Sequence, residues 1–204
     1  MLYDYLLETF RENEPIFLSD IHYDNYSDIW LKKELAKLCD NGQIIRYERG
    51  IYYIPVKTPF GNSILNPNRI IERKYLFEKG KRIGFYTGIM ALQQAGLSTQ
   101  MTNIPEIQTN NEKSKLRRVK IGNQEVILRR SRVTIDNDNI FVLQFLEMMN
   151  STSLGYFDDD RKAVIKNWIR KCNISQAHVT KYAPFFPDKV MRNLIESGVI
   201  YYVA

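Results

Sequence analysis

The sequence predicts a protein of the α+β class, with a small helix-and-strand domain followed by a larger mixed domain. In some segments, apolar residues recur at helical spacing. In others they form short runs between turn signals, as strands do. These helical and extended segments do not alternate strictly, as they would in a parallel α/β sheet, so the two kinds of element are expected to be mixed.

Two helices are expected at the start of the chain. Residues 1–10 carry apolar side chains at helical spacing, and Pro15 marks a break after them. A brief second helix is expected over Phe17–Ile21, started by Ser19, before a turn at residues 23–25.

The third helix is expected to begin after Ser27, its N-cap, and to run to about Cys39. Gly42 then supplies the left-handed conformation in which helices commonly end. One side of this helix is an apolar stripe and the other is expected to be open. The stripe consists of Leu31, Leu35 and Leu38, and the opposite face is expected to carry Trp30, Lys33 and Lys37.

A two-stranded ribbon follows, with strands expected at residues 44–47 and 51–54. Arg46 and Arg49 lie at or near its tip, and strand alternation places one of Tyr52 and Tyr53 inward and the other outward. Three helices followed by such a ribbon are the layout of a winged helix-turn-helix domain. We assign it to residues 1–56.

Residues 57–67 are rich in Pro, Gly, Asn and Ser and are expected to form a linker to a second domain, residues 68–204. That domain is expected to contain a strand over 104–109 and a hairpin with strands over 116–121 and 124–130 around Gly122-Asn123. Its helices are expected over residues 69–79, 84–95, 140–149, 161–172 and 188–197.

The formal net charge of +6 favours an anionic partner, with nucleic acid the leading candidate, although a basic surface can also serve solubility alone. The two cysteines, Cys39 and Cys172, are expected to be buried or half-buried free thiols of a reducing compartment. No signal peptide and no run long enough to cross a membrane is recognisable, so a cytoplasmic protein without a membrane partner is expected.

The third helix and the ribbon supply the candidate DNA contacts. The start of a recognition helix reads bases in the major groove, and its flanks meet phosphates. The ribbon tip can enter a minor groove or clamp a phosphate. The alternative is a solvated face that binds nothing. The candidate residues are Tyr26, Ser27, Trp30, Lys33 and Lys37 on the helix, with Arg46 and Arg49 on the ribbon.

A second basic surface is expected between Lys113 and Arg132, where eight cations stand against a single acid, Glu125. It could touch DNA, or an acidic or RNA-bearing partner. Alternatively, its cations guard an edge strand against aggregation. The residues that we assign to this surface are Lys115, Arg117, Arg118, Lys120, Arg129 and Arg130.

No catalytic constellation is recognisable, so an enzyme is not expected, and neither a cofactor nor a metal ion is assigned. The run Asp158–Asp160 is expected to open the following helix, where acids suit the helix dipole. Gly80, Gly84 and Gly88 are spaced as in neither a P-loop nor a dinucleotide fingerprint. Gly88 is expected to allow close packing inside a helix.

Three segments resemble the abortive-infection type E antitoxins and their relatives. They are Leu35–Pro55, Phe85–Gln100, with its Ala-Leu before Gly-Leu and a Thr-Gln end, and the strand Glu106–Thr109. The resemblance covers about two thirds of the chain. It implies an antitoxin that represses its own operon through the N-terminal domain, and whose C-terminal domain counters a nucleotidyltransferase-like toxin without a stable complex.

We therefore expect a DNA-binding transcriptional regulator that binds an operator upstream of its own gene. The alternatives are a protein-interaction module on a winged-helix scaffold, anchored by Trp30, and an RNA-binding module that uses the hairpin between Lys115 and Arg130. Sequence preference for the upstream DNA distinguishes the first alternative, and competition between duplex DNA and structured RNA distinguishes the second.

Overall fold

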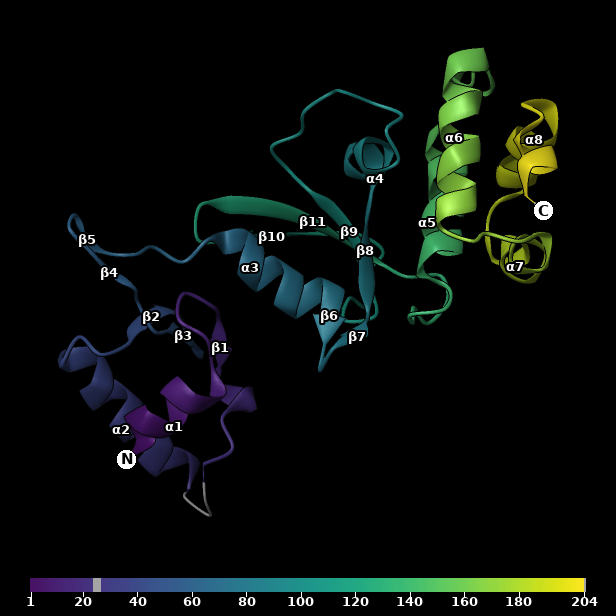
Figure 1. The fold of residues 1–204 in the computed structure, drawn as a ribbon. Helices are drawn as coiled ribbons and strands as arrows, with labels where there is room; N and C mark the ends of the chain where they lie inside the picture. Colours follow the sequence, from purple (N-terminus) through teal and green to yellow (C-terminus); the bar gives the residue numbers. More distant parts are fainter. Residues whose placement is uncertain (24–26, 204) are drawn as a thin grey trace. The chain divides into compact units, whose positions relative to one another are not determined.

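The computed structural model of the 204-residue chain describes residues 1–23 and 27–203. The chain divides into two compact units, residues 1–73 with 121–123 and residues 74–120 with 124–204, which we call the N-terminal and C-terminal units. Both units combine helices with strands, so the predicted α+β class is confirmed (Figure 1).

The N-terminal unit combines helices with a small antiparallel sheet, in an order consistent with a winged helix. Helix α1 (Leu2–Thr9), strand β1 (Ile16–Phe17) and helix α2 (Asp28–Asp40) precede the hairpin of β2 (Ile45–Glu48) and β3 (Ile51–Tyr53). The three strands form one antiparallel sheet in the order β1-β3-β2. This layout is consistent with the predicted winged helix, except at the second of its three expected helices.

The expected second helix is wrong in both its start and its type. Ile16 and Phe17 are a strand that pairs with β3, and only a single 3₁₀ turn, Leu18–Asp20, follows. Phe17, and not Ser19, is the residue before that turn. Pairing with β3 holds Ile16 and Phe17 extended, and the amide of Leu18 then donates to the carbonyl of Gly50 (2.9 Å). Pairing in the sheet therefore decides the conformation of Ile16 and Phe17, which local spacing assigned to a helix.

Helix α2 begins and ends as predicted. The Ser27 hydroxyl accepts a hydrogen bond from the amide of Trp30 (3.3 Å), which caps the first turn. Gly42 adopts a φ of 67°, and the amide of Gln43 donates back to the carbonyl of Leu38 (3.0 Å). Leu31 and Leu35 face the core of the unit, which is formed by α1, α2 and the sheet.

The expectation that Tyr52 and Tyr53 point to opposite environments is wrong, because both are buried, with 7% and 4% exposure. Alternate side chains of a strand project from opposite faces, so other segments must cover both faces of the sheet at β3. Tyr52 belongs to the helix-facing core, and the hydroxyl of Tyr53 donates to the carbonyl of Ser63 (3.0 Å).

The stretch expected to be a linker contains a small exposed hairpin of β4 (Lys57–Thr58) and β5 (Gly61–Asn62). Ser63 ties this stretch to the N-terminal unit, since its hydroxyl donates to Asn13 (3.0 Å) and accepts from the amide of Val56 (2.9 Å). The division between the units falls after Arg73.

Helix α3 (Pro67–Ile71) continues into a π-helical turn, Glu72–Leu76, so the helix expected over 69–79 ends earlier than predicted. A tight hairpin of β6 (Phe77–Glu78) and β7 (Lys81–Arg82) takes up its last residues. At the hairpin turn Lys79 and Gly80 both have positive φ, 48° and 79°.

The central sheet of the C-terminal unit has four strands in the order β10-β11-β9-β8. Strand β9 (Glu106–Thr109) pairs in parallel with β11 (Gln124–Arg130) and antiparallel with β8 (Gly84–Thr87). Strand β10 (Arg117–Ile121) is an edge strand, and the hairpin that it forms with β11 confirms the prediction for residues 116–130.

The helix expected over residues 84–95 is wrong in its first third. Gly84–Thr87 is β8, and helix α4 covers only Gly88–Gln94. Gly84 packs so closely on the π-helical turn that a Cβ there would lie 2.0 Å from the carbonyl oxygen of Tyr75. Gly88 begins α4 with a φ of 60°, so its role is at the strand-to-helix turn and not inside a helix.

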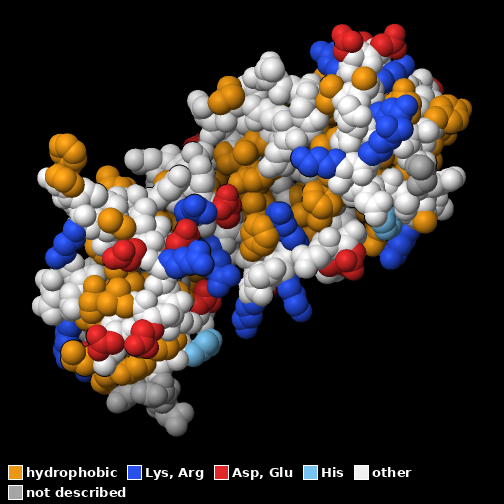
Figure 2. All heavy atoms as spheres, viewed as in Figure 1, with side chains coloured by type: hydrophobic (Ala, Val, Ile, Leu, Met, Phe, Trp, Pro, Cys, Tyr) orange, Lys and Arg blue, Asp and Glu red, His pale blue; other side chains and the backbone are white. Residues whose placement is uncertain are grey.

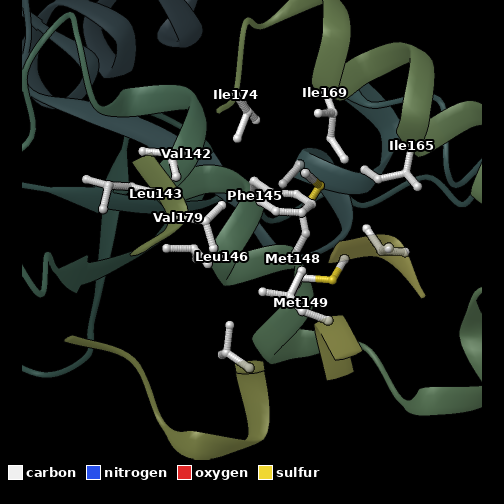
Figure 3. Close-up of a cluster of buried hydrophobic side chains, with 14 of the residues drawn as sticks. Val142, Leu143, Phe145, Leu146, Met148, Met149, Ile165, Ile169, Ile174 and Val179 are labelled. Carbon is white, nitrogen blue, oxygen red and sulfur yellow. The ribbon is translucent and has the colours of Figure 1, made fainter. Parts of the chain in front are cut away.

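Helix α5 (Ile140–Ser151) forms the centre of the largest hydrophobic core. Nine of its twelve residues are buried, so the helix is covered on almost every side. Figure 3 shows Phe145, Met148 and Met149 of α5 among side chains of other segments, including Ile165 and Val179.

Three helices complete this layer. Helix α6 (Asp159–Lys171) begins as predicted at the aspartate run, where the carboxylate of Asp158 accepts from the amide of Arg161 (2.9 Å). Helix α7 (Gln176–Tyr182), a short helix capped by Ser175, was not predicted from the sequence. Helix α8 (Asp188–Glu196) is tied to α5 because the side-chain amide of Asn193 donates to the backbone carbonyl of Met149 (2.8 Å).

Candidate nucleic-acid interface

The outward face of α2 is confirmed as exposed at both predicted lysines, Lys33 and Lys37, and also at Ser27. Lys37 pairs with Glu34 one turn earlier (2.5 Å), which partly offsets its charge. The structure gives Lys33 no acidic partner among the described residues. The uncompensated positive charge on this face therefore lies near the middle of the helix, at Lys33.

Trp30 does not lie on this open face, contrary to expectation. It is half-buried and packs against the core of the N-terminal unit. Each residue of an α-helix is turned by roughly 100° from the previous one, so Trp30 lies at the flank of the leucine stripe and not opposite to it. A large aromatic side chain at such a position gains more from packing than from exposure.

Trp30 instead ends a row of aromatic rings that joins α1 to α2. Its ring stacks on Tyr23, with centroids 6.0 Å apart and planes at 9°. Tyr23 contacts Tyr5 (5.2 Å), and Tyr5 contacts Phe10 edge-on (6.4 Å). This row helps to fix the position of α2 within the unit. Trp30 thereby positions the exposed lysines of α2 without lying on their face.

Two exposed residues of α2 were missed by the sequence analysis. Ile29 is 69% exposed in the first turn, and Lys32 is exposed beside Lys33. The signal was present, because a position midway around the helix from Leu31 and Leu35 falls at Ile29 and Lys33. Tyr26, also assigned to this face, lies outside the described residues.

The ribbon places both of its predicted arginines in solvent. Arg46 is exposed on β2, and Arg49 is exposed in the turn between β2 and β3. The ladder shifts register between Arg46 and Glu48, which marks a bulge near the tip. Arg46, Arg49 and Lys33 are thus three exposed cations carried by α2 and the wing of one compact unit.

The second predicted basic surface is less uniformly open than its sequence indicates. Two of its four arginines on the sheet pair with carboxylates from neighbouring segments: Arg117 with Glu112 (2.7 Å) and Arg129 with Glu106 (3.0 Å). Arg132 pairs with Glu147 of α5 (2.9 Å). On the face in view, Figure 2 shows basic and acidic side chains next to one another in several places.

Glu112 is the most deeply buried of these carboxylates, at 4% exposure. Burial by itself would raise the pKa of Glu112, but the amide of Ser114 (2.8 Å) and the guanidinium of Arg117 outweigh burial and hold that pKa below its ordinary value. Arg117 therefore neutralises a buried carboxylate of its own unit, which makes it less available to bind a partner.

Of the six residues assigned to this surface, four are exposed and have no acidic partner among the described residues. Those on the edge strand β10 are Arg118 and Lys120, and the other two are Lys115 and Arg130.

Both cysteines are free and half-buried, as predicted. Burial raises the pKa of the Cys39 thiol, and the neighbouring charge of Asp40 adds to the effect. Burial likewise raises the pKa of Cys172. Both thiols are therefore poor nucleophiles near neutral pH. Within residues 1–23 and 27–203, no three His, Cys, Asp or Glu side chains gather as metal ligands do.

A family model described as "Family of unknown function (DUF6088)" matches residues 7–176. The chain belongs to this family. The match includes α2, the ribbon, the whole central sheet and α5, and it ends as α7 begins. No curated protein matches the chain. Across the described part of the chain, no helix combines the length and apolar character needed to span a membrane.

Proposed function

We propose that the DUF6088 chain is a DNA-binding transcriptional regulator that recognises its operator through α2 and the β2–β3 ribbon. The single observation that supports the proposal most is the arrangement of exposed cations in the N-terminal unit. A capped helix carries Lys32 and Lys33 on its open face, and the ribbon beside it in the same unit carries Arg46 and Arg49.

The chemistry of this arrangement suits duplex DNA. The N-terminal turn of α2, with Ser27 and Ile29, enters the major groove, where a hydroxyl can reach a base edge or phosphate and an alkyl group can contact a thymine methyl. The lysines neutralise phosphates along the groove walls, and Arg49 at the ribbon tip reaches the adjacent minor groove.

We further propose that the regulator is an antitoxin-like autorepressor that opposes a nucleotidyltransferase-class toxin. The resemblance of residues 35–55, 85–100 and 106–109 to abortive-infection type E antitoxins supports this finer assignment. A gene for such a toxin next to this one, and loss of its toxicity on co-expression, are the observations that test it.

The half-buried state of Trp30 does not favour a protein-interaction module anchored by this side chain, since its ring packs on Tyr23 and the unit's own core. The duplex-DNA proposal draws on Lys33 and Arg49 instead, which are exposed.

The proposal is tested by fluorescence anisotropy with duplex DNA from upstream of the gene and a shuffled duplex of equal composition. We expect the full chain to prefer the upstream duplex and to lose affinity steeply as salt rises. The double variant Lys33→Glu/Lys37→Glu should abolish this binding while its melting temperature stays close to that of the wild type, because both side chains are exposed.

The matched control is Arg11→Glu/Lys57→Glu, which makes the same charge change at exposed positions of the same unit outside α2 and the ribbon. It should retain binding within a few-fold. If both double variants weaken binding equally, net charge and not the α2 face carries the affinity. Undiminished binding by the α2 variant removes the assignment.

A further inference from the structure

The C-terminal unit contains a polar cleft with a volume of about 610 Å³, which the DNA-binding proposal leaves without a role. It opens where the carboxyl end of β11 meets the last turns of α5. Small-molecule sites in proteins commonly have volumes of roughly 300–1,000 Å³. The cleft is therefore large enough for a ligand of several functional groups.

The strand register explains why this cleft is polar although it faces a helix. Phe85 of β8 packs in the core with α5, so its face of the sheet is the one that α5 covers. Gln108 of β9 lies opposite Phe85, and Arg129 of β11 lies beside Gln108, so both project from that same face. Thr87 and Glu106 form the next row on this face.

The cleft carries more positive than negative charge. Four cations and two carboxylates line it, namely Lys115, Arg129, Arg130, Arg132, Glu106 and Glu147.

Each carboxylate of the cleft orients one arginine through its Nε atom, Glu106 with Arg129 (3.0 Å) and Glu147 with Arg132 (2.9 Å). The terminal nitrogens of both guanidinium groups are not used in these bonds. Lys115 and Arg130 have no acidic partner among the described residues. An anion entering the cleft would meet two uncompensated cations and two held arginines.

Two nearly buried polar side chains also aim into the cleft. Thr87 and Gln108 are each only 5% exposed, and neither makes a side-chain hydrogen bond to another described residue. Yet, across the described residues, no fully buried polar side-chain atom lacks a partner. Their polar atoms must therefore retain contact with solvent, and the cleft that both side chains line provides it.

One aromatic ring lines this otherwise polar cleft. Phe185 follows α7 and keeps 54% of its surface exposed, although the next residue, Phe186, is buried beneath Arg132 (5.1 Å). An exposed aromatic ring beside a cationic groove offers a stacking face for a nucleobase, whichever base it is.

We propose that this cleft binds a nucleoside phosphate. Its phosphates lie against Lys115 and Arg130, where no carboxylate offsets the charge, and its base stacks on Phe185. Gln108 and Thr87 offer an amide and a hydroxyl to the sugar or base between them. This binding does not depend on the operator contacts, which lie in the other unit.

The test is isothermal titration of the full chain with ATP, with GTP and with inorganic phosphate, each separately. We expect one saturable site for at least one of the two nucleotides, and binding of inorganic phosphate weaker by about tenfold or more, because phosphate alone lacks the stacking contact. Absence of saturable binding of both nucleotides overturns the proposal.

Two variants separate the parts of the site. Lys115→Ala/Arg130→Ala should weaken nucleotide binding by about tenfold or more, since charge-assisted hydrogen bonds to phosphate are lost. Phe185→Ala should weaken binding of the nucleotide but leave that of inorganic phosphate unchanged. All three residues are at the surface, and a thermal melt of each variant shows whether the unit remains folded.

The control is Arg118→Ala/Lys120→Ala, which removes two exposed cations of the same hairpin that do not line the cleft. It should bind nucleotide within about twofold of the wild type. An equal loss in the control would make the binding a diffuse surface effect and overturn the site. Tighter binding of a single-stranded tetranucleotide than of ATP or GTP, lost in the Lys115→Ala/Arg130→Ala variant, would overturn the mononucleotide and assign the cleft to a nucleic-acid strand.

Discussion

Helix α2 and the β10–β11 hairpin are both rich in cations, but they hold them differently. On α2, Lys32 and Lys33 stand in solvent without an acidic partner among the described residues. On and after the hairpin, Arg117, Arg129 and Arg132 each pair with a carboxylate. The lysines of α2 are therefore available to an anionic partner, whereas three arginines of the second region form ion pairs within the protein.

The difference shows that a count of cations along a segment is not a count of cations available for binding. The segment from Lys113 to Arg132 contains one acid, but its neutralising carboxylates come from outside it, from β9, from Glu112 and from α5. Two of these carboxylates, Glu112 and Glu147, are buried. Variants that remove one cation at a time should therefore have opposite consequences in the two regions.

The largest effect is expected for Arg132→Met. Among the described residues, it leaves the carboxylate of Glu147, which is 6% exposed, with the side-chain amide of Asn150 (3.2 Å) as its one side-chain partner. We expect a loss of about 2–3 kcal/mol in the free energy of unfolding, measured by urea denaturation, because a buried charge loses its main counter-ion. Arg118→Met, which removes an exposed arginine, should stay within about 0.5 kcal/mol. Equal losses for the two variants would contradict the comparison.

The next effect is expected for Trp30→Ala, about 2 kcal/mol for a half-buried ring that packs on Tyr23 and the core. DNA affinity should fall as well, because the aromatic row positions α2. Trp30→Phe keeps an aromatic ring there and should recover most of the stability. A Trp30→Ala variant of unchanged stability would show that the row does not hold the helix.

Arg117→Met should cost about 1 kcal/mol at pH 7, discounted because the Arg117 side chain is half exposed. The pKa of Glu112 is held below its ordinary value in the folded chain, so the stabilisation is present above the unfolded pKa, about 4.3. It is lost as the pH falls through the folded pKa. Unfolding curves of wild type and variant should therefore differ at pH 7 and converge towards pH 2–3. A difference that is independent of pH would exclude the ion pair as its cause.

The smallest effect on stability is expected for Lys33→Ala, within about 0.5 kcal/mol, because this side chain is exposed and unpaired in the described structure. Its effect should instead appear in DNA binding, where the dependence of log affinity on log salt should become shallower by about one unit. Lys37→Ala should change that slope less, since Lys37 already pairs with Glu34. A slope unchanged by Lys33→Ala would mean that this lysine meets no phosphate.

The sequence was sufficient for elements that carry their own local signals. The Ser27 cap, the Gly42 stop and the hairpin around Gly122-Asn123 all lie where their turn chemistry placed them. The outward direction of Lys33 and Lys37 followed from the leucine stripe, because helical spacing alone fixes it.

The sequence was insufficient where distant segments decide. Ile16–Phe17 and Gly84–Thr87 have spacing that suits a helix, but each pairs with a strand far along the chain. The position of Trp30 was predicted wrongly because its burial depends on Tyr23 and α1. Tyr52 and Tyr53 are both buried because other segments cover the two faces of the sheet at β3. The polar cleft went unnoticed because its lining residues come from separate elements.

Helix α5 has a consequence for the relatives of this protein. The DUF6088 match stops at residue 176, but α5 rests on α7 and α8, which lie almost entirely past that boundary. In a relative that shares α5 but differs after it, the side chains equivalent to Leu146 and Met149 would face water. Its own C-terminal segment would have to cover them instead. Any C-terminal segment that takes the place of α7 and α8 must therefore supply apolar side chains of comparable volume against α5, whatever its sequence.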